Sequence, residues 1–112
     1  MIFITGPLFA GKKEYAKAAL HLTDDAFARV AVWDVEQLAA SSDDLTALAD
    51  RLAQSAVVIA TEIGGGVVPM EASARLAREK AGQLAQLLAA RAQTVIRVCC
   101  GLPQLLKGEL PC

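Results

Sequence analysis

Residues Gly6 to Lys13 read G-P-L-F-A-G-K-K, so a G-x-x-x-x-G-K motif directly follows the apolar run Met1 to Thr5. A phosphate-binding loop leaves a buried strand, wraps its backbone N–H groups around the anion and enters a helix whose N-terminus attracts negative charge. The glycines allow positive φ, and the lysine of the motif reaches the terminal phosphates. The motif therefore predicts binding of ATP or GTP. The residues expected to contact the nucleotide are Gly6, Pro7, Ala10, Gly11, Lys12 and Lys13.

One position departs from the usual motif. Ser or Thr normally follows the motif lysine and ligates Mg²⁺ through its hydroxyl, but Lys13 occupies that position here. The alternative interpretation is a strand-to-helix turn that contains Gly and Lys for other reasons. The placement of the stretch, between an apolar run and a helical pattern, favours nucleotide binding.

Two carboxylates follow apolar runs at other points of the chain. Asp34 ends the run V-A-V-W-D, and Glu62 follows A-V-V-I-A-T. The carboxyl ends of parallel strands meet at one edge of a sheet, where ligands of open α/β folds bind. We therefore expect Lys12, Asp34 and Glu62 to be catalytic, with Asp34 holding Mg²⁺ and Glu62 orienting a water or accepting a proton. The alternatives are a strand-end turn for Asp34 and an ordinary surface loop for Glu62.

Further candidates are weaker. Gly64 to Gly66 are costly in backbone entropy, which indicates close approach to a ligand. Arg75 and Arg78 could reach phosphate, although Arg75 and Glu79 also have the spacing of a surface ion pair. Trp33 is expected in the core rather than under a nucleotide base.

The composition limits the class of protein. The chain has 112 residues and a net charge of −1, which favours a single domain spanning 1–112 and gives no basic excess for nucleic acid. Charged residues interrupt every apolar stretch before the roughly 18 residues of a membrane span, and no signal peptide is evident. Three cysteines without metal-ligand spacing predict a reducing cytoplasm, with Cys99 and Cys100 as small hydrophobes in or beside a buried strand.

Short β-type runs alternate with helical patterns, which predicts an α/β fold with helices packed on a small, mainly parallel sheet. Ser41 and Asp44 have the spacing of a capping box before a helix. Four parallel strands would leave two open sheet edges, which favours a homo-oligomer. The expected strands are 1–5, 30–35, 56–60 and 94–100, and the expected helices are 13–22, 45–52 and 71–92, with no assignment for 105–112.

The stretch Thr61 to Pro69, T-E-I-G-G-G-V-V-P, resembles the N-E-V-G-x-G-I-V-P-type motif of the adenosylcobinamide kinase/adenosylcobinamide-phosphate guanylyltransferases of cobalamin biosynthesis. The resemblance continues to Val98–Pro103, V-C-C-G-L-P, which is similar to the V-x-G-I/L-P-like end of that family. It implies a P-loop NTPase-like three-layer fold and a corrinoid acceptor. The family's R-x-x-R-D/E-x-x-G-x-x-x-Q spacing is matched by Arg75, Arg78, Glu79, Gly82 and Gln86, with Gly82 expected at a close-packing position.

Full-length members of that family are longer, and the missing part falls between the first helix and the Asp34 strand. That part carries the histidine that is guanylylated in the transferase half-reaction, and His21 lies too early to match it. The resemblance thus implies a shortened relative without guanylyl transfer.

Three functions remain open from the sequence. The first is a kinase-like protein that transfers the terminal phosphate of ATP or GTP to a corrinoid hydroxyl, which Asp34 and Glu62 favour. The second is a non-catalytic nucleotide- or corrinoid-binding module for regulation or assembly, which Lys13 and the short length favour. The third, an α/β protein that binds nothing, has the least support.

Overall fold

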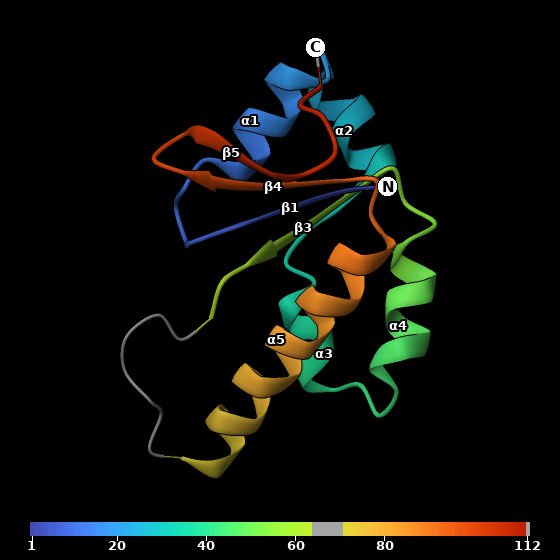
Figure 1. Cartoon of the computed structure of the whole chain (residues 1–112), viewed down its shortest axis with the longest axis vertical. Helices are drawn as coiled ribbons and strands as arrows, with labels where there is room; N and C mark the ends of the chain where they lie inside the picture. Colours follow the sequence, from blue (N-terminus) through green and yellow to red (C-terminus); the bar gives the residue numbers. More distant parts are fainter. Residues whose placement is uncertain (64–70, 112) are drawn as a thin grey trace.

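A five-stranded sheet organises the chain, in a computed structural model that describes residues 1–63 and 71–111 (Figure 1). Its strand order is β2-β3-β1-β4-β5. The first four strands in the chain are parallel, as predicted, and β5 runs antiparallel to β4. The strands are β1 Ile2–Gly6, β2 Ala31–Val32, β3 Val57–Thr61, β4 Thr94–Cys99 and β5 Leu102–Lys107.

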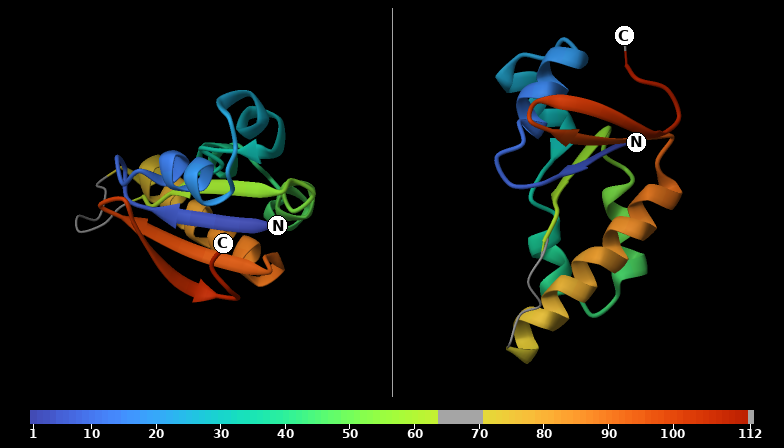
Figure 2. Two further views of the ribbon diagram at one scale, coloured as in Figure 1. Left: turned by 90° about the horizontal axis from the view of Figure 1, so that it is seen from above. Right: turned by 60° about the vertical axis from the view of Figure 1, so that its left-hand side comes forward.

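Helices cover both faces of this sheet (Figures 1 and 2). The helices α1 and α2 lie on one face, and α3, α4 and α5 lie on the other. The helices are α1 Lys12–Ala19, α2 Asp24–Val30, α3 Glu36–Ala40, α4 Leu45–Leu52 and α5 Ala72–Arg91. None of the described helices is long and apolar enough to cross a membrane.

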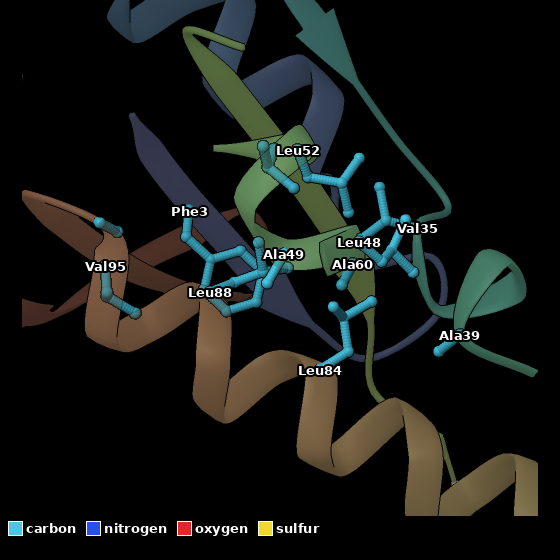
Figure 3. Close-up of a cluster of buried hydrophobic side chains, with 12 residues drawn as sticks. Phe3, Val35, Ala39, Leu48, Ala49, Leu52, Ala60, Leu84, Leu88 and Val95 are labelled. Atoms are coloured by element: carbon cyan, nitrogen blue, oxygen red, sulfur yellow. The ribbon is translucent and has the colours of Figure 1, made fainter. Parts of the chain in front are cut away.

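Alternating side chains of the central strands divide the core into two clusters. In β1, Phe3 points to the face covered by α4 and α5, and the next residue, Ile4, points to the face covered by α1 and α2. Figure 3 shows Leu84 and Leu88 of α5 directed at Phe3 and Ala60 of the sheet. Because β1 and β3 are buried on both faces, they are continuous apolar runs, as central parallel strands must be.

The predicted strand 30–35 is mostly wrong. Only Ala31 and Val32 pair with β3, because Val30 ends helix α2 and Asp34 takes a left-handed conformation with φ 56°. The unpredicted helix α2 begins at Thr23, whose hydroxyl accepts a hydrogen bond from Ala26 N at 3.2 Å. A β-type run of four apolar residues is thus shared between a helix end, a short strand and a turn.

The capping box at Ser41 and Asp44 is also wrong. Ser41 ends the unpredicted helix α3, and Asp44 is the N-cap of α4, where its carboxylate accepts a hydrogen bond from Ala47 N at 3.1 Å. The expected helix 45–52 is confirmed as α4, and its residues Leu48, Ala49 and Leu52 are buried against α5 and the sheet.

The end of the chain forms a hairpin that we did not predict. Cys100 and Gly101 both have positive φ, 54° and 73°, as a two-residue hairpin turn requires, and β5 follows them. Cys99 ends β4 and Cys100 directly follows it, as expected, but both are exposed and do not serve as buried small hydrophobes. Cys100 lies in the turn of the hairpin, and Cys99 is the last residue of β4 before that turn.

Candidate functional site

The loop between β1 and α1 is shaped by its two glycines. A Cβ on Gly6, where φ is 154°, would lie 2.2 Å from the carbonyl oxygen of Val98 in the neighbouring strand. Gly11 has φ 85° and lies against the hairpin turn, where Gly101 N donates a hydrogen bond to Ala10 O at 2.8 Å. The loop is thus held between the end of β1 and the β4–β5 turn, and both glycines of the motif occupy positions that favour glycine.

Lys12 turns back into this loop as the first residue of α1. It is only 8% exposed, and its Nζ donates hydrogen bonds to Pro7 O at 2.7 Å and to Gly6 O at 3.2 Å. Burial lowers the pKa of Lys12, while nearby carboxylates, first Glu36 and then Asp34, oppose this shift. An ammonium buried beside the N-terminus of a helix gives the loop a concentrated positive charge.

Asp34 and the loop line one cavity of about 230 Å³. Asp34 is exposed, and its left-handed backbone turns the chain at the carboxyl edge of the sheet. Thr61 from β3 also lines this cavity. The structure therefore brings together the predicted phosphate loop and the predicted metal-binding carboxylate.

The fit of this cavity to Mg²⁺ rests on Asp34. Among the described residues, no group of three or more His, Cys, Asp or Glu side chains is placed to hold a metal ion. Mg²⁺ in nucleotide sites is usually held by one or two carboxylates together with phosphate oxygens and water. One carboxylate beside a phosphate loop therefore fits a Mg²⁺ that arrives with a nucleotide.

Lys13 interacts with an aromatic ring rather than with the loop. Its Nζ lies 4.6 Å from the centroid of the Trp33 ring, within the range of a cation–π interaction. Trp33 is 36% exposed and stacks on Phe27 with a centroid distance of 5.5 Å, so its expected place in the core is wrong. The Lys13 side chain thus ties α1 to the segment that carries Asp34.

Glu62 is paired with Arg97 of β4. Its two carboxylate oxygens accept hydrogen bonds from Arg97 Nε at 2.6 Å and Arg97 Nη2 at 3.0 Å. The hydrogen bond and charge of Arg97 lower the pKa of Glu62, and those of Glu62 raise the pKa of Arg97. A carboxylate with a lowered pKa is a poor proton acceptor at neutral pH, which weighs against the role of general base that we expected.

Replacing Arg97 with Gln should raise the pKa of Glu62 toward the ordinary value of 4.5. In the wild type, the pair stabilises the fold fully above that value, and this contribution is lost as the pH falls through the lower pKa of the folded state. In Arg97→Gln, the free energy of unfolding should therefore fall less steeply as the pH is lowered, because the carboxyl group of Glu62 no longer has a lowered pKa in the folded state. Carbon-13 NMR titration of the Glu62 carboxyl group measures the shift, and an unchanged Glu62 titration would contradict the pairing.

Glu36 is the site residue that the sequence analysis missed. It begins α3, is only 6% exposed, and its Oε1 accepts a hydrogen bond from Thr61 N at 2.7 Å. Among the nearby charges, the Glu36 carboxylate raises the pKa of Lys12 most strongly, which partly offsets the lowering by burial. The available signal was a second carboxylate two residues after Asp34, but the stretch was predicted as the end of a strand.

Other predicted residues lie apart from the loop. Gly64–Gly66 and Pro69 lie outside the described residues. Gly82 is exposed, and a Cβ there would meet no atom within 4 Å, so its expected close packing is wrong. Arg78 lines a second cavity with Glu62, and His21 is exposed in the turn that follows α1.

Comparison with protein families gives one match. The model of the family described as cobinamide kinase / cobinamide phosphate guanyltransferase matches residues 18–106, which is more than half of the chain. The phosphate-loop motif lies before the matched range, so the loop and the family match are independent observations. Comparison with individually curated proteins gave no significant match.

Proposed function

The chain belongs to the cobinamide kinase / cobinamide phosphate guanyltransferase family, and from that premise we propose that it binds ATP or GTP at Gly6–Lys13 and phosphorylates a corrinoid hydroxyl. The family acts in cobalamin biosynthesis and uses nucleotides as substrates. Guanylyl transfer is left out of the proposal, because His21 follows α1 in an exposed turn and the residues between α1 and Asp34 contain no other histidine.

The observation that carries the proposal is the position of Lys12. Its ammonium is buried inside the turn of the loop and bound to the carbonyls of Gly6 and Pro7. These neutral carbonyls only partly compensate a buried cation, whereas the phosphates of a nucleotide would compensate it fully. A P-loop NTPase-like fold is supported by the same arrangement, since the loop joins the central strand β1 to α1.

In the proposed reaction, Lys12 and the backbone N–H groups of the loop stabilise the charge of the transferring phosphoryl group. Asp34 would hold Mg²⁺, which supplies charge neutralisation at the phosphates when bound. Glu62, already ion-paired with Arg97, would orient groups at the strand end rather than take a proton.

Calorimetric titration with ATP and GTP, each with and without Mg²⁺, tests the nucleotide site. Incubation with cobinamide and the preferred nucleotide then tests turnover, with the phosphorylated corrinoid detected by mass spectrometry. Binding of either nucleotide with formation of this product supports the kinase. Failure of both nucleotides to bind overturns the proposal.

A second candidate is a non-catalytic nucleotide- or corrinoid-binding module. It is favoured by Lys13, which stands where a metal-binding hydroxyl is usual and contacts Trp33, and by the pairing of Glu62 with Arg97. Nucleotide binding without any phosphorylated corrinoid in the same experiment would support this candidate. Self-association and a cytoplasmic location remain predictions for either candidate.

Replacing Lys13 with Thr should increase the Mg²⁺ dependence of nucleotide binding. The new hydroxyl would restore a direct metal ligand, and a gain of about tenfold is in the range of one interaction with a charged group. Lys13→Met is the matched control, because it removes the charge, keeps an apolar side chain against Trp33 and adds no hydroxyl. Titrations with Mg²⁺ and with a chelator measure the ratio of affinities. A wild-type affinity that already collapses with the chelator would contradict the prediction.

A further inference from the structure

A second cavity, of about 250 Å³, opens at the carboxyl end of β3 on the face covered by α5. Its lining residues come from strand ends β1 and β3, from the start of α3 and from the middle of α5. The polar lining residues and the helix glycine are Thr5, Glu36, Thr61, Glu62, Arg78 and Gly82.

This cavity and the phosphate-loop cavity meet at the same strand end. Thr61 lines both of them. Ile59 lines the loop cavity and belongs to the core beneath α1, whereas Ala60 lines the second cavity and belongs to the core beneath α5. Gly6 O accepts hydrogen bonds both from Lys12 Nζ, at 3.2 Å, and from Glu62 N, at 2.9 Å. The two cavities thus lie on either side of the place where a terminal phosphate would be held.

The second cavity contains a buried carboxylate with one oxygen available. Oε1 of Glu36 accepts the hydrogen bond from Thr61 N, and within the described part of the chain Oε2 accepts none. No fully buried side-chain oxygen of the described residues lacks a partner, so Oε2 reaches accessible space. Because Glu36 lines this cavity, a hydroxyl that enters it meets a carboxylate oxygen fixed by the backbone of β3.

Gly82 leaves the α5 lining of the cavity without a side chain at this position. A glycine inside a helix is less favourable than alanine by about 1 kcal/mol. Packing among the described residues does not require glycine at this position, because a Cβ at Gly82 would meet nothing within 4 Å. The helix therefore accepts a less stable residue at a position that lines the same cavity as Glu36 and Glu62.

We propose that this second cavity is the acceptor subsite and that it takes only a short hydroxyl-bearing arm of the acceptor. The inference rests on the proposed phosphoryl transfer. Pockets that enclose a drug-sized ligand measure about 300–1,000 Å³, so a cavity of about 250 Å³ admits an arm and leaves a corrinoid macrocycle outside.

In this arrangement, the arm hydroxyl donates its hydrogen bond to Oε2 of Glu36. Its oxygen attacks the terminal phosphorus of the nucleotide, a new O–P bond forms, and the bond from that phosphorus to the bridging oxygen breaks. The nucleoside diphosphate leaves with the electron pair of the broken bond, and the hydroxyl proton passes to an oxygen of the transferred phosphoryl group and from there to water. Glu36 orients the hydroxyl through its hydrogen bond. Lys12 stays on the nucleotide side throughout.

The variant Gly82→Leu tests the subsite by filling it. The substitution replaces glycine with a strong helix former, so the melting temperature should rise while cobinamide affinity falls at least tenfold. Affinity for ATP and GTP should change less than twofold. Ala90→Leu is the matched control, since Ala90 is also exposed on α5 and lines neither cavity. Equilibrium dialysis with cobinamide and with each nucleotide measures the affinities.

The outcomes separate this inference from the proposed function. Unchanged cobinamide affinity in a folded Gly82→Leu protein, or a wild type that binds nucleotide but no cobinamide, overturns the acceptor subsite and leaves nucleotide binding standing. A wild type that binds cobinamide but no nucleotide overturns the phosphate site instead.

The variant Glu36→Gln tests the carboxylate itself. Glutamine retains an oxygen for Thr61 N but removes the negative charge, so the hydrogen bond to the arm hydroxyl loses its charge assistance and cobinamide affinity should fall about tenfold. Unchanged cobinamide affinity in a folded Glu36→Gln protein would remove Glu36 from the acceptor subsite.

Discussion

Replacing Gly6 with Ala should destabilise the protein more than any other single substitution in the loop. The new Cβ would lie 2.2 Å from Val98 O, a backbone atom of the adjacent strand, at a φ of 154° that side chains rarely adopt. Either β1 or β4 must move in the middle of the sheet. We expect a loss of about 3–4 kcal/mol in the free energy of unfolding, which is a large part of the roughly 5–15 kcal/mol of a typical domain. Thermal unfolding followed by circular dichroism measures it.

Gly11→Ala provides the matched comparison. Gly11 also has a positive φ, 85°, but a Cβ there would make an ordinary 3.5 Å contact with Gly101 Cα. Only the left-handed backbone then carries a penalty, about 1–2 kcal/mol. Gly6→Ala should therefore lower the melting temperature more than Gly11→Ala does. Equal losses, or a Gly6→Ala protein that unfolds at the wild-type temperature, would contradict the close approach of β1 and β4.

The sequence predicted those parts of the fold whose local pattern and long-range packing agree. β1 and β3 are apolar runs buried on both faces, and α5 is a long helical pattern that packs on the sheet through Leu84 and Leu88. The loop Gly6–Lys13 was predicted because its motif is contiguous in the sequence, although the steric requirement at Gly6 comes from Val98 in β4. These elements position Lys12, the predicted phosphate-binding lysine.

The stretch 30–41 shows why the sequence did not predict Glu36 as a site residue. Its apolar residues fit a strand, but Asp34 adopts a positive φ that only the tertiary structure reveals, and the chain then enters α3. Glu36 consequently lies under the end of β3 rather than on a sheet surface. The contact of Glu36 with Thr61, 25 residues away in the chain, leaves no local pattern in the sequence.

The hairpin at the end of the chain was missed for a different reason. Gly101 and Pro103 were interpreted as the end of a strand, although a two-residue turn with two positive φ angles returns the chain at once. That turn also supports the phosphate loop through Gly101 N and Ala10 O. The exposed leucines of β5, among them Leu102 at 70% exposure, gave no alternation that would indicate an edge strand.

Replacing Lys12 with Met should remove most of the phosphate affinity without unfolding the protein. Methionine keeps the length of the side chain and removes the buried ammonium, whose burial itself lowers its pKa. A charge-assisted interaction contributes about 1.5–3 kcal/mol, so the dissociation constant for ATP or GTP should rise roughly 10- to 150-fold. Titration calorimetry of Lys12→Met and the wild type measures the difference, and Lys17→Met, on the same helix but outside the cavity, is the control.

The pH dependence of the wild type should identify Lys12 as the source of that affinity. Its pKa in the free protein is lowered from 10.5, so nucleotide affinity, which needs the ammonium, should fall as the pH rises through a value below 10.5. Stability should move in the opposite direction: the unfolded chain binds more protons than the folded protein between the two pKa values, so the free energy of unfolding rises with pH there. In Lys12→Met, both dependences should disappear. A loss of affinity at alkaline pH that persists in Lys12→Met would assign the titration to another group and remove Lys12 from the phosphate site.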